Sequence, residues 1–407
     1  MRILILHHYA GSPQHGMSYR VYYLAREWVK AGHYVHIYAA SFSHVRTVQP
    51  KFLGKTLTEI IDGIFYTWYK TPTYTCNGFK RVINILSFAW QTYVNAKKIA
   101  IESNPDVVIA ASTHLLDILA AQKIKKQTNA KLIFEVRDLW PLTLIELGNM
   151  PKWHPFIILM RKVENYAYEK ADSIVTVLPK AKYYMVYRGM HPSKFHYIPN
   201  GIEISEWEKE ISLPDELFYY LDTVKKIKKP IIGYAGAYGL ANDLDLLIDV
   251  AKLCPQDFEV VLVGHGPERD RLATRIQQEK IKNVKLFHAI PKCCIPNFLK
   301  SIDITYISFL PKPIYRFGIS PNKLMDYMMS GKPVVCALQA GNDPVAEAGC
   351  GITVAPGDVN MIRNAILKLI SMSPDDRDAM GKRGKKFILE KQVYPVLARR
   401  FIDVMVS

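Results

Sequence analysis

The stretch that decides the fold is GISPNKLMDYMMSGKPVV, from Gly318 to Val335. It predicts a loop, a short helix and then a buried strand. Ser320 is placed to cap the helix, and Pro321 suits its first turn, where no N–H is needed. Gly331 suits the left-handed turn that ends a helix, and the apolar run after it predicts the strand.

Two charged side chains of this short helix are three residues apart. Lys323 and Asp326 therefore lie on one face. A cation and a carboxylate beside a helix N-terminus suit a ligand that carries both a phosphate and a diol. We therefore expect a nucleotide sugar here. The alternatives are a solvated lysine and a charge on an exposed helix face.

Four other stretches strengthen this interpretation by their order along the chain. They are EVRDLWP (Glu135–Pro141), IPNGIE (Ile198–Glu203), YAGAYGLANDLD (Tyr234–Asp245) and LVGHGPERDRL (Leu262–Leu272). Together with the first stretch they resemble glycosyltransferases of family 4, in the branch that makes bacterial surface polysaccharides such as O-antigen and capsule. The resemblance implies an α/β fold of the GT-B type, with two Rossmann-like doubly wound domains, a cleft between them and a C-terminal helix that crosses back to the first domain.

Strand and helix patterns alternate along the 407 residues, which predicts two α/β domains. We expect an acceptor-side domain at 1–199, a nucleotide-sugar-binding domain at 200–385 and the crossing helix at 386–407. The expected strands of the first domain are Arg2–His7, His33–Ala40, Pro105–Ser112, Lys131–Asp138, Asp172–Leu178 and Phe195–Pro199, with helices at Ser18–Gly32 and Leu115–Gln127. Those of the second are Pro230–Ala237, Phe258–Gly264, Asn283–Ala289, Ile304–Phe309 and Lys332–Leu338.

The composition, with 49% apolar and 22% charged residues, is that of a soluble globular protein. No segment reaches the roughly 18–20 apolar residues of a membrane span. Met1 leads directly into a strand pattern, so we expect no secretory leader. The six cysteines lack the paired spacing of a metal site, which favours a reduced, cytoplasmic compartment.

The net positive charge of the chain comes mainly from its first half. Residues 1–200 contain 25 Lys and Arg against 12 Asp and Glu, and the remainder contains 28 against 25. This predicts a basic face directed at an anionic partner, with a scattered solubilising charge as the alternative. Because no aromatic RNA-binding motif, zinc module or helix-turn-helix accompanies the charge, we expect no nucleic-acid partner.

The segment from Asn77 to Glu102 is rich in apolar and aromatic residues and has basic residues at both ends. Such a segment lies either on an anionic lipid surface or in the core of the first domain. A lipid-linked acceptor, common in the resembled branch, favours the first alternative. We expect a peripheral location on the inner face of a bacterial plasma membrane.

Two glycine loops in the second domain are candidate phosphate sites. They follow apolar strands and open helices, where small residues let a phosphate approach the backbone N–H groups. A tight strand-to-helix turn is the alternative reading. The glycines are Gly236 and Gly239 in the first loop, and Gly264 and Gly266 in the second.

The resemblance assigns the donor site in more detail. It implies that Asp326 binds the ribose hydroxyls, although family members usually have the longer glutamate. Many members hold the diphosphate with an Arg and a Lys, where this chain has Ala237 and Asn242. We therefore expect Lys323 to bind the diphosphate, with Arg316 and Arg269 as further candidates.

The family's other glutamate, which touches the donor sugar, is replaced by Gly318. We expect the sugar to be read instead by backbone N–H groups from Phe317 to Ser320 and by the Asn322 side chain. Asp243 and Asp245 match the metal-binding pattern DxD of another transferase fold. Both belong to the start of a predicted helix, where acidic residues are favoured, so we expect no metal.

The acceptor site is expected at the ends of the first-domain strands. The candidates are Gly11, His15 and Gly16 in the first loop, His114, Arg137 and Asp138. Cleft lining and structural roles remain open for His15. The resemblance implies a retaining, metal-independent transfer of a hexose or N-acetylaminosugar from a nucleotide sugar to a lipid-linked or oligosaccharide acceptor without a cofactor, and we expect the donor to be a UDP-sugar. Asp138 or His114 would orient the acceptor, or the leaving phosphate would take its proton, while Lys323 stabilises the diphosphate.

Two other functions fit parts of the sequence. One group of sugar-nucleotide epimerases shares the two-domain architecture, and such an enzyme needs acid and base side chains but no separate acceptor. The basic first domain argues against it. The third candidate, a basic nucleic-acid-binding protein, is supported by charge alone.

Overall fold

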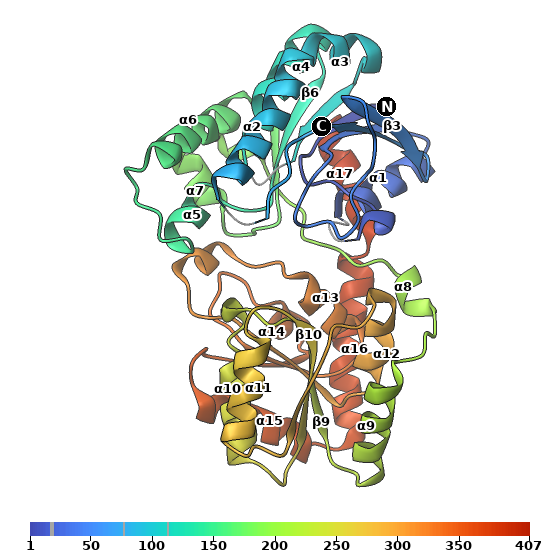
Figure 1. Cartoon of the computed structure of the whole chain (residues 1–407), viewed down its shortest axis with the longest axis vertical. Coiled ribbons are helices and arrows are strands. Elements are labelled where there is room, and N and C mark those ends of the chain that lie inside the picture. The colour runs from blue at the N-terminus through green and yellow to red at the C-terminus, as the bar shows by residue number, and fades with distance from the viewer. Residues whose placement is uncertain (17–19, 76–77, 112–113) are drawn as a thin grey trace. The chain divides into compact units, whose positions relative to one another are not determined.

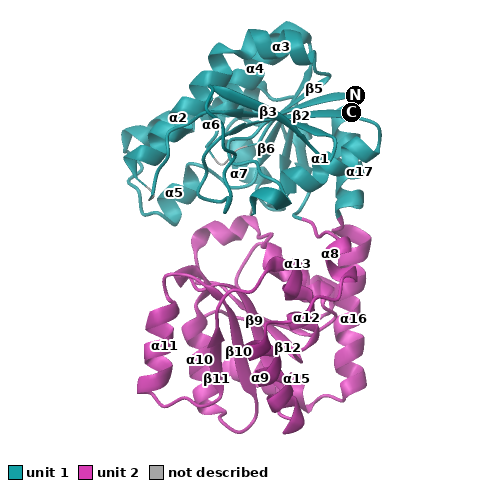
Figure 2. Cartoon of the chain, turned by 45° about the vertical axis from the view of Figure 1, so that its right-hand side comes forward, with its two compact units in different colours: residues 1–200, 394–407 teal, residues 201–393 magenta. Residues whose placement is uncertain are grey.

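The computed structural model describes residues 1–16, 20–75, 78–111 and 114–407 (Figure 1). They divide into unit 1, Met1–Asn200 with Tyr394–Ser407, and unit 2, Gly201–Val393, drawn teal and magenta in Figure 2. Three predicted features lie outside the described residues: the helix start at Ser18, the segment start at Asn77 and the strand end at Ser112. No helix within the described ranges is long and apolar enough to span a lipid bilayer.

Unit 1 is built on a sheet with eight strands among the described residues, in the order β3-β4-β2-β1-β5-β6-β7-β8. All neighbours are parallel except β3, which is antiparallel to β4. Central strands such as β1 and β5 are almost entirely buried, as continuous apolar runs require in a parallel sheet. The strands are β1 (Arg2–Leu6), β2 (Tyr34–Ala40), β3 (Thr56–Ile61), β4 (Ile64–Tyr69), β5 (Val107–Ala110), β6 (Lys131–Val136), β7 (Ser173–Thr176) and β8 (Phe195–Tyr197).

Helices cover this sheet and extend to the outer surface of the unit (Figure 2). The predicted segment ending at Glu102 forms two helices, because the chain bends at Asn95 between α2 and α3. The helices are α1 (Arg20–Lys30), α2 (Phe79–Val94), α3 (Ala96–Ser103), α4 (Asp117–Thr128), α5 (Leu142–Glu146), α6 (Pro155–Lys170), α7 (Lys182–Tyr187) and, from the chain end, α17 (Tyr394–Val406).

The C-terminal segment returns to unit 1, as predicted. It consists of two helices, because the pattern breaks at Gln392–Val393 between α16 (Pro374–Lys391), in unit 2, and α17. Trp28 of α1 donates its indole N–H to the carbonyl of Ala398 at 3.1 Å, and its ring lies 5.2 Å from that of Phe401. The last helix is thus part of the apolar core of unit 1.

Unit 2 contains a fully parallel six-stranded sheet in the order β11-β10-β9-β12-β13-β14. The order along the sheet reverses between β9 and β12, and open α/β sheets bind ligands beyond the carboxyl ends of strands at such a point. The strands are β9 (Ile231–Ala237), β10 (Glu259–His265), β11 (Val284–Phe287), β12 (Ile304–Ser308), β13 (Val334–Ala337) and β14 (Gly351–Val354).

Buried apolar side chains from one face of this sheet, such as Ile232, Leu262 and Tyr306, pack with side chains of the covering helices to form a core of unit 2. The helices are α8 (Ser205–Glu208), α9 (Asp215–Lys226), α10 (Leu244–Leu253), α11 (Arg269–Gln278), α12 (Ile295–Lys300), α13 (Asn322–Met329), α14 (Pro344–Ala348), α15 (Val359–Ser371) and α16.

Candidate functional site

The candidate site of unit 2 lies where the strand order reverses. The loop after β9 and the loop after β12 are tied together there, because Leu310 donates its N–H to the carbonyl of Ala241 at 3.1 Å. The Ser308 hydroxyl donates to the carbonyl of Asn242. Helix α13 follows the second loop, so the fold brings its side chains to the same crevice.

Lys323 of α13 projects toward the end of β9. Its Nζ donates to the Tyr234 hydroxyl at 3.2 Å and to Asn242 Oδ1. The ammonium also lies 4.9 Å from the centroid of the Tyr234 ring and 5.4 Å from that of Phe309. No carboxylate in the described part of the chain forms an ion pair with it, and burial lowers its pKa to about 8. Lys323 is thus a half-buried cation available to an anion.

Asn242 explains how this chain holds that cation. Its amide nitrogen donates to the carbonyl of Ala237 at 2.8 Å, which turns the amide oxygen toward Lys323. Ala237 and Asn242, which stand where many family members have an Arg and a Lys, therefore both contribute to holding this cation. Asn242 positions a lysine that comes from another helix, and the exposed Ala237 accepts the bond that orients it.

Asp326 lies one turn further along α13 and is partly exposed. None of the described residues donates a hydrogen bond to its carboxylate. Burial raises its pKa to about 7, Lys292 lowers it and Glu206 raises it. Because Lys292 is already paired with Glu206 at 2.7 Å, the carboxylate of Asp326 remains an acceptor for a ligand.

The start of α13 differs from the prediction. The helix begins at Asn322 with Pro321 at the N-cap position, so Ser320 is one residue too early to cap it. The reason is that Pro321 adopts an extended conformation (φ −77°, ψ 130°) rather than the first helical turn. Asn322 is exposed, and Gly331 ends the helix with φ of +71°, as predicted.

In the loop from Phe317 to Ser320, which was expected to bind the sugar, some backbone N–H groups already donate hydrogen bonds within the protein. Gly318 N–H donates to Tyr315 and Ile319 N–H donates to Asn342 Oδ1 at 2.7 Å, so these two groups are not free to bind a sugar. The expectation is wrong for both. The Arg316 guanidinium donates to Pro313 in the same loop and lies 4.3 Å from the Phe317 ring centroid.

Arg269, the other candidate for the diphosphate, lies at the start of α11. It contacts His288 Nε2 at 3.0 Å and Asp270 at 3.7 Å. Unlike Lys323, it already has a carboxylate partner. The structure therefore favours Lys323 as the cation for a phosphate.

The two glycine loops pack against each other. A Cβ on Gly264 would lie 1.8 Å from the carbonyl oxygen of Gly236, and one on Gly266, where φ is +153°, would lie 2.3 Å from that of Tyr238. Close backbone approach therefore requires glycine at 264 and 266, whether or not a phosphate binds. At Gly239 the nearest atom is 3.8 Å away, so that position is open.

We expect Gly264→Ala to lower the free energy of unfolding by about 2–4 kcal/mol, because the opposing backbone cannot move away cheaply. Gly239→Ala, at φ of −122°, is the matched control and is expected to change stability by less than about 0.5 kcal/mol. Urea denaturation of both variants checks this. Equal stability of the two would refute the packing argument.

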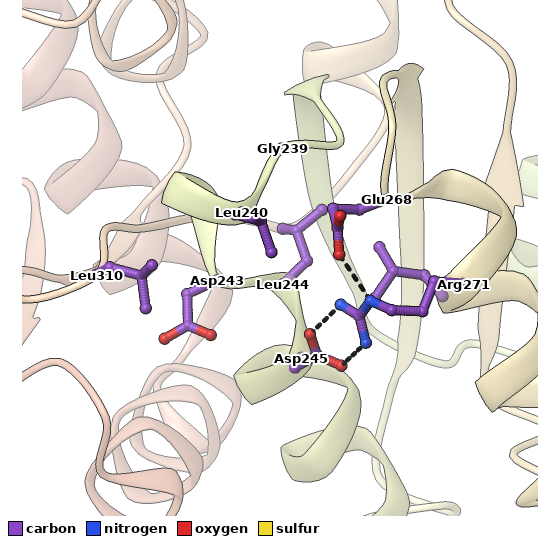
Figure 3. Close-up of a pocket in the computed structure, with 9 residues that line it drawn as sticks. Gly239, Leu240, Asp243, Leu244, Asp245, Glu268, Arg271 and Leu310 are labelled. Carbon is purple, nitrogen blue, oxygen red and sulfur yellow. Dashed lines mark hydrogen bonds and ion pairs between the residues drawn. The ribbon is translucent and has the colours of Figure 1, made fainter. Parts of the chain in front are cut away.

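Asp243 and Asp245 lie at the start of α10, as predicted, and line a cavity of about 100 Å³ (Figure 3). Asp245 is paired with Arg271 and, at 2.6 Å, with Arg275, and Asp243 points away from them. Asp245 is thus neutralised by arginines. Within the described ranges no group of three or more His, Cys, Asp or Glu side chains is arranged to hold a metal ion.

The predicted acceptor residues of unit 1 lie near the ends of β1, β5 and β6 and differ in exposure. His114 is fully buried between rings, 4.8 Å from His8 by centroid, and neither ring nitrogen has a hydrogen-bond partner. Burial lowers its pKa to about 3, so it is neutral. Arg137 contacts His7 Nε2 at 3.2 Å, whereas Asp138 is exposed. Of these three residues, Asp138 is the most exposed.

The first loop of unit 1 has mainly structural contacts. The Ser12 hydroxyl lies 2.9 Å from His15 Nδ1, and the buried His15 ring lies 4.9 Å from that of Trp68. The carbonyl of Gly11 accepts a bond from the Tyr66 hydroxyl at 3.0 Å. A Cβ on Gly16, at φ of +74°, would lie 2.0 Å from Thr47 Oγ1. For His15 the structure favours a packing role.

Sequence reasoning missed three residues of the unit 2 site. They are Tyr234 and Phe309, which contact Lys323, and Asn342, which fixes the loop before α13. Tyr234 and Phe309 lie in or directly after apolar strands, where an aromatic residue is ordinary. The one available signal was their place in, or directly after, the two strands that flank the reversal.

Comparison with known proteins agrees with this architecture. Residues 15–206 match the family model Glycosyltransferase Family 4, and residues 222–387 match Glycosyl transferases group 1. The chain is 19% identical over 366 residues (88% of this chain, 86% of the relative) to the probable glycosyltransferase WbjE of Pseudomonas aeruginosa. It is 22% identical over 302 residues (71% and 72%) to the putative colanic acid biosynthesis glycosyl transferase WcaI of Escherichia coli K12.

The fold is similar to that of Anabaena Alr3699/HepE, solved in complex with UDP and glucose. The TM-score is 0.67, with 13% identity and coverage of 100% of both chains. The predicted GT-B fold, with two mostly parallel α/β units, is confirmed.

Proposed function

Because the chain belongs to the glycosyltransferases that join a family 4 domain to a group 1 domain, we propose that it transfers a sugar from a UDP-sugar to a lipid-linked or oligosaccharide acceptor in the synthesis of a bacterial surface polysaccharide. The single observation that carries the proposal is the state of α13. One turn of this helix separates a half-buried cation from a carboxylate, and the described residues provide neither a carboxylate partner for the first nor a hydrogen-bond donor for the second. A diphosphate and a ribose diol satisfy these two groups.

Three findings support the finer assignments. Alr3699/HepE was solved with UDP and glucose, which favours UDP as the nucleotide. WcaI is named for colanic acid biosynthesis, which favours an extracellular polysaccharide as the product. The excess of basic residues in residues 1–200 favours an acceptor held at the anionic inner face of a plasma membrane.

We propose a retaining, metal-independent transfer of a hexose or an N-acetylaminosugar. Lys323 stabilises the charge that develops on the leaving diphosphate, and Asp326 holds the ribose so that the anomeric carbon is fixed. No general base is assigned to His114, because its ring is fully buried and its low pKa makes it a weak base. The exposed Asp138 is the better candidate to orient the acceptor hydroxyl.

The test is incubation of the purified chain with a panel of UDP-, GDP- and dTDP-sugars, with and without a lipid extract of bacterial membranes. Release of nucleoside diphosphate that requires the extract is the expected result, and NMR of the product gives the anomeric configuration. An excess of EDTA should leave the rate unchanged. Conversion of the sugar nucleotide without an acceptor would instead indicate the epimerase.

A further inference from the structure

The outer face of helix α2 in unit 1 is apolar along its whole length. Its exposed apolar side chains recur every three or four residues, which places them on one side of the helix. Phe79 is 79% exposed and Trp90 is 66% exposed. We call this surface the α2 stripe, and its members are Phe79, Ile83, Leu86, Trp90, Tyr93 and Val94.

The opposite face of α2 fixes the helix in this orientation. Asn84 is fully buried and bonds to His8 Nε2 at 2.6 Å, to the Thr71 hydroxyl at 3.0 Å and to the carbonyl of Pro72 at 2.6 Å. Rotation of the helix would break all three bonds inside the protein. Ile85 and Phe88 of the same inner face are also buried, so apolar packing and this polar network together hold the exposed apolar side chains outward.

The charged residues around the α2 stripe are basic, which indicates the kind of surface that the stripe would bind. Residues 63–101 contain no Asp or Glu, and their basic residues are Lys70, Lys80, Arg81, Lys97 and Lys98. Lys123 of the neighbouring helix α4 borders the stripe, with Nζ 3.1 Å from the carbonyl of Tyr93 and 4.4 Å from its ring centroid. An apolar face with aromatic residues and a basic border is typical of a helix that lies in the interface of an anionic membrane.

We propose that the α2 stripe docks on an anionic lipid surface, with its aromatic side chains inserted at the level of the headgroups and the bordering lysines on the lipid phosphates. A second copy of this chain fits less well, because its stripe would bring the same basic border against this one, and the next carboxylate along the chain, Glu102, is already paired with Lys98 at 3.7 Å. The proposal deepens the proposed function and rests on it for one point only, that a lipid-linked acceptor gives the docking its purpose.

The experiment is co-sedimentation of the full chain with vesicles of phosphatidylcholine alone or mixed with phosphatidylglycerol, at low salt. The wild type is expected to bind the mixed vesicles and not the neutral ones. Phe79→Ser/Trp90→Ser is expected to lower the partition coefficient about tenfold or more. Its matched control is Phe218→Ser/Tyr219→Ser on α9, which removes two aromatic side chains of similar exposure, 53% and 64%, and should bind as the wild type does.

A second pair of variants tests the charges. Lys80→Glu/Lys97→Glu is expected to reduce binding about tenfold or more, whereas Lys225→Glu/Lys226→Glu at the end of α9 should not. Absence of wild-type binding to the mixed vesicles, or equal loss in the stripe and control variants, would overturn the proposal. A wild-type dimer that the stripe variant dissociates, seen by sedimentation velocity without vesicle binding, would identify a second copy as the occupant instead.

Binding of UDP, measured by calorimetry without vesicles, separates this proposal from the proposed function. The stripe variant should bind UDP as the wild type does. If the wild type binds vesicles but no nucleotide or sugar nucleotide, the docking proposal is supported and the proposed transferase function is refuted.

Discussion

Replacement of Asp326 by alanine is expected to lower kcat/KM for the sugar-nucleotide donor by about a hundredfold to ten-thousandfold. In the proposed donor site the carboxylate accepts two hydrogen bonds from a ribose diol. Bonds to a charged group contribute about 1.5–3 kcal/mol each, and every 1.4 kcal/mol is a factor of ten in rate. Steady-state kinetics with the active donor and calorimetry with UDP measure the effect on turnover and on binding.

Two further variants separate recognition from general damage. Asp326→Asn keeps the shape but loses the charge, so we expect an effect between those of the wild type and Asp326→Ala. Asp270→Ala removes a carboxylate that is 97% exposed on α11 and should leave kcat/KM within about twofold. UDP affinity in Asp326→Ala equal to that in Asp270→Ala would place the ribose elsewhere.

The sequence predicted both charged residues of α13 because their spacing depends on one local helix. It did not predict Asn242 as the residue that positions Lys323, because 81 residues separate the two. That contact exists only because β9 and β12 are neighbours in the sheet. Ser320 was misassigned for a local reason, since Pro321 is compatible with both the N-cap position and the first turn.

The β3–β4 hairpin was missed although its turn carries a signal. Asp62 and Gly63 have φ of +51° and +79°, and the dipeptide Asp-Gly between two β-rich runs is typical of a two-residue hairpin turn. Strand β3 lies at the sheet edge and is largely exposed, so it lacks the apolar run by which the buried strands were recognised.

The burial of the unit 1 histidines could not be predicted either. A histidine at the end of a strand suits a cleft as well as a core, and the choice depends on what packs above it. For His8 that is Phe88, whose ring lies 5.3 Å away by centroid and comes from a helix about 80 residues later. The sequence therefore located the described ends of these strands to within two residues but did not predict which of their side chains face solvent.

Replacement of Lys323 by methionine is expected to lower kcat about a hundredfold to a thousandfold, as the loss of one preorganised group that stabilises developing charge does in other enzymes. The free energy of unfolding should stay the same or increase, because the wild-type protein half-buries an ammonium group for which the described part of the chain provides no carboxylate partner. We therefore expect kcat to fall while the free energy of unfolding does not, when kinetics and urea denaturation are measured on the same preparation. Loss of stability together with activity would indicate a structural lysine instead.

The pH dependence of UDP binding gives a second, independent test of Lys323. Asp326 is ionised above its pKa of about 7, and Lys323 is protonated below its pKa of about 8. Both charges coexist mainly between these values, so affinity should be highest from about pH 7 to 8 and should fall on either side. Lys323→Arg should keep binding and remove the decrease at alkaline pH, because a guanidinium stays protonated there. Asp326→Asn should remove the decrease at acidic pH. An alkaline decrease that persists in Lys323→Arg would mean that another group binds the diphosphate.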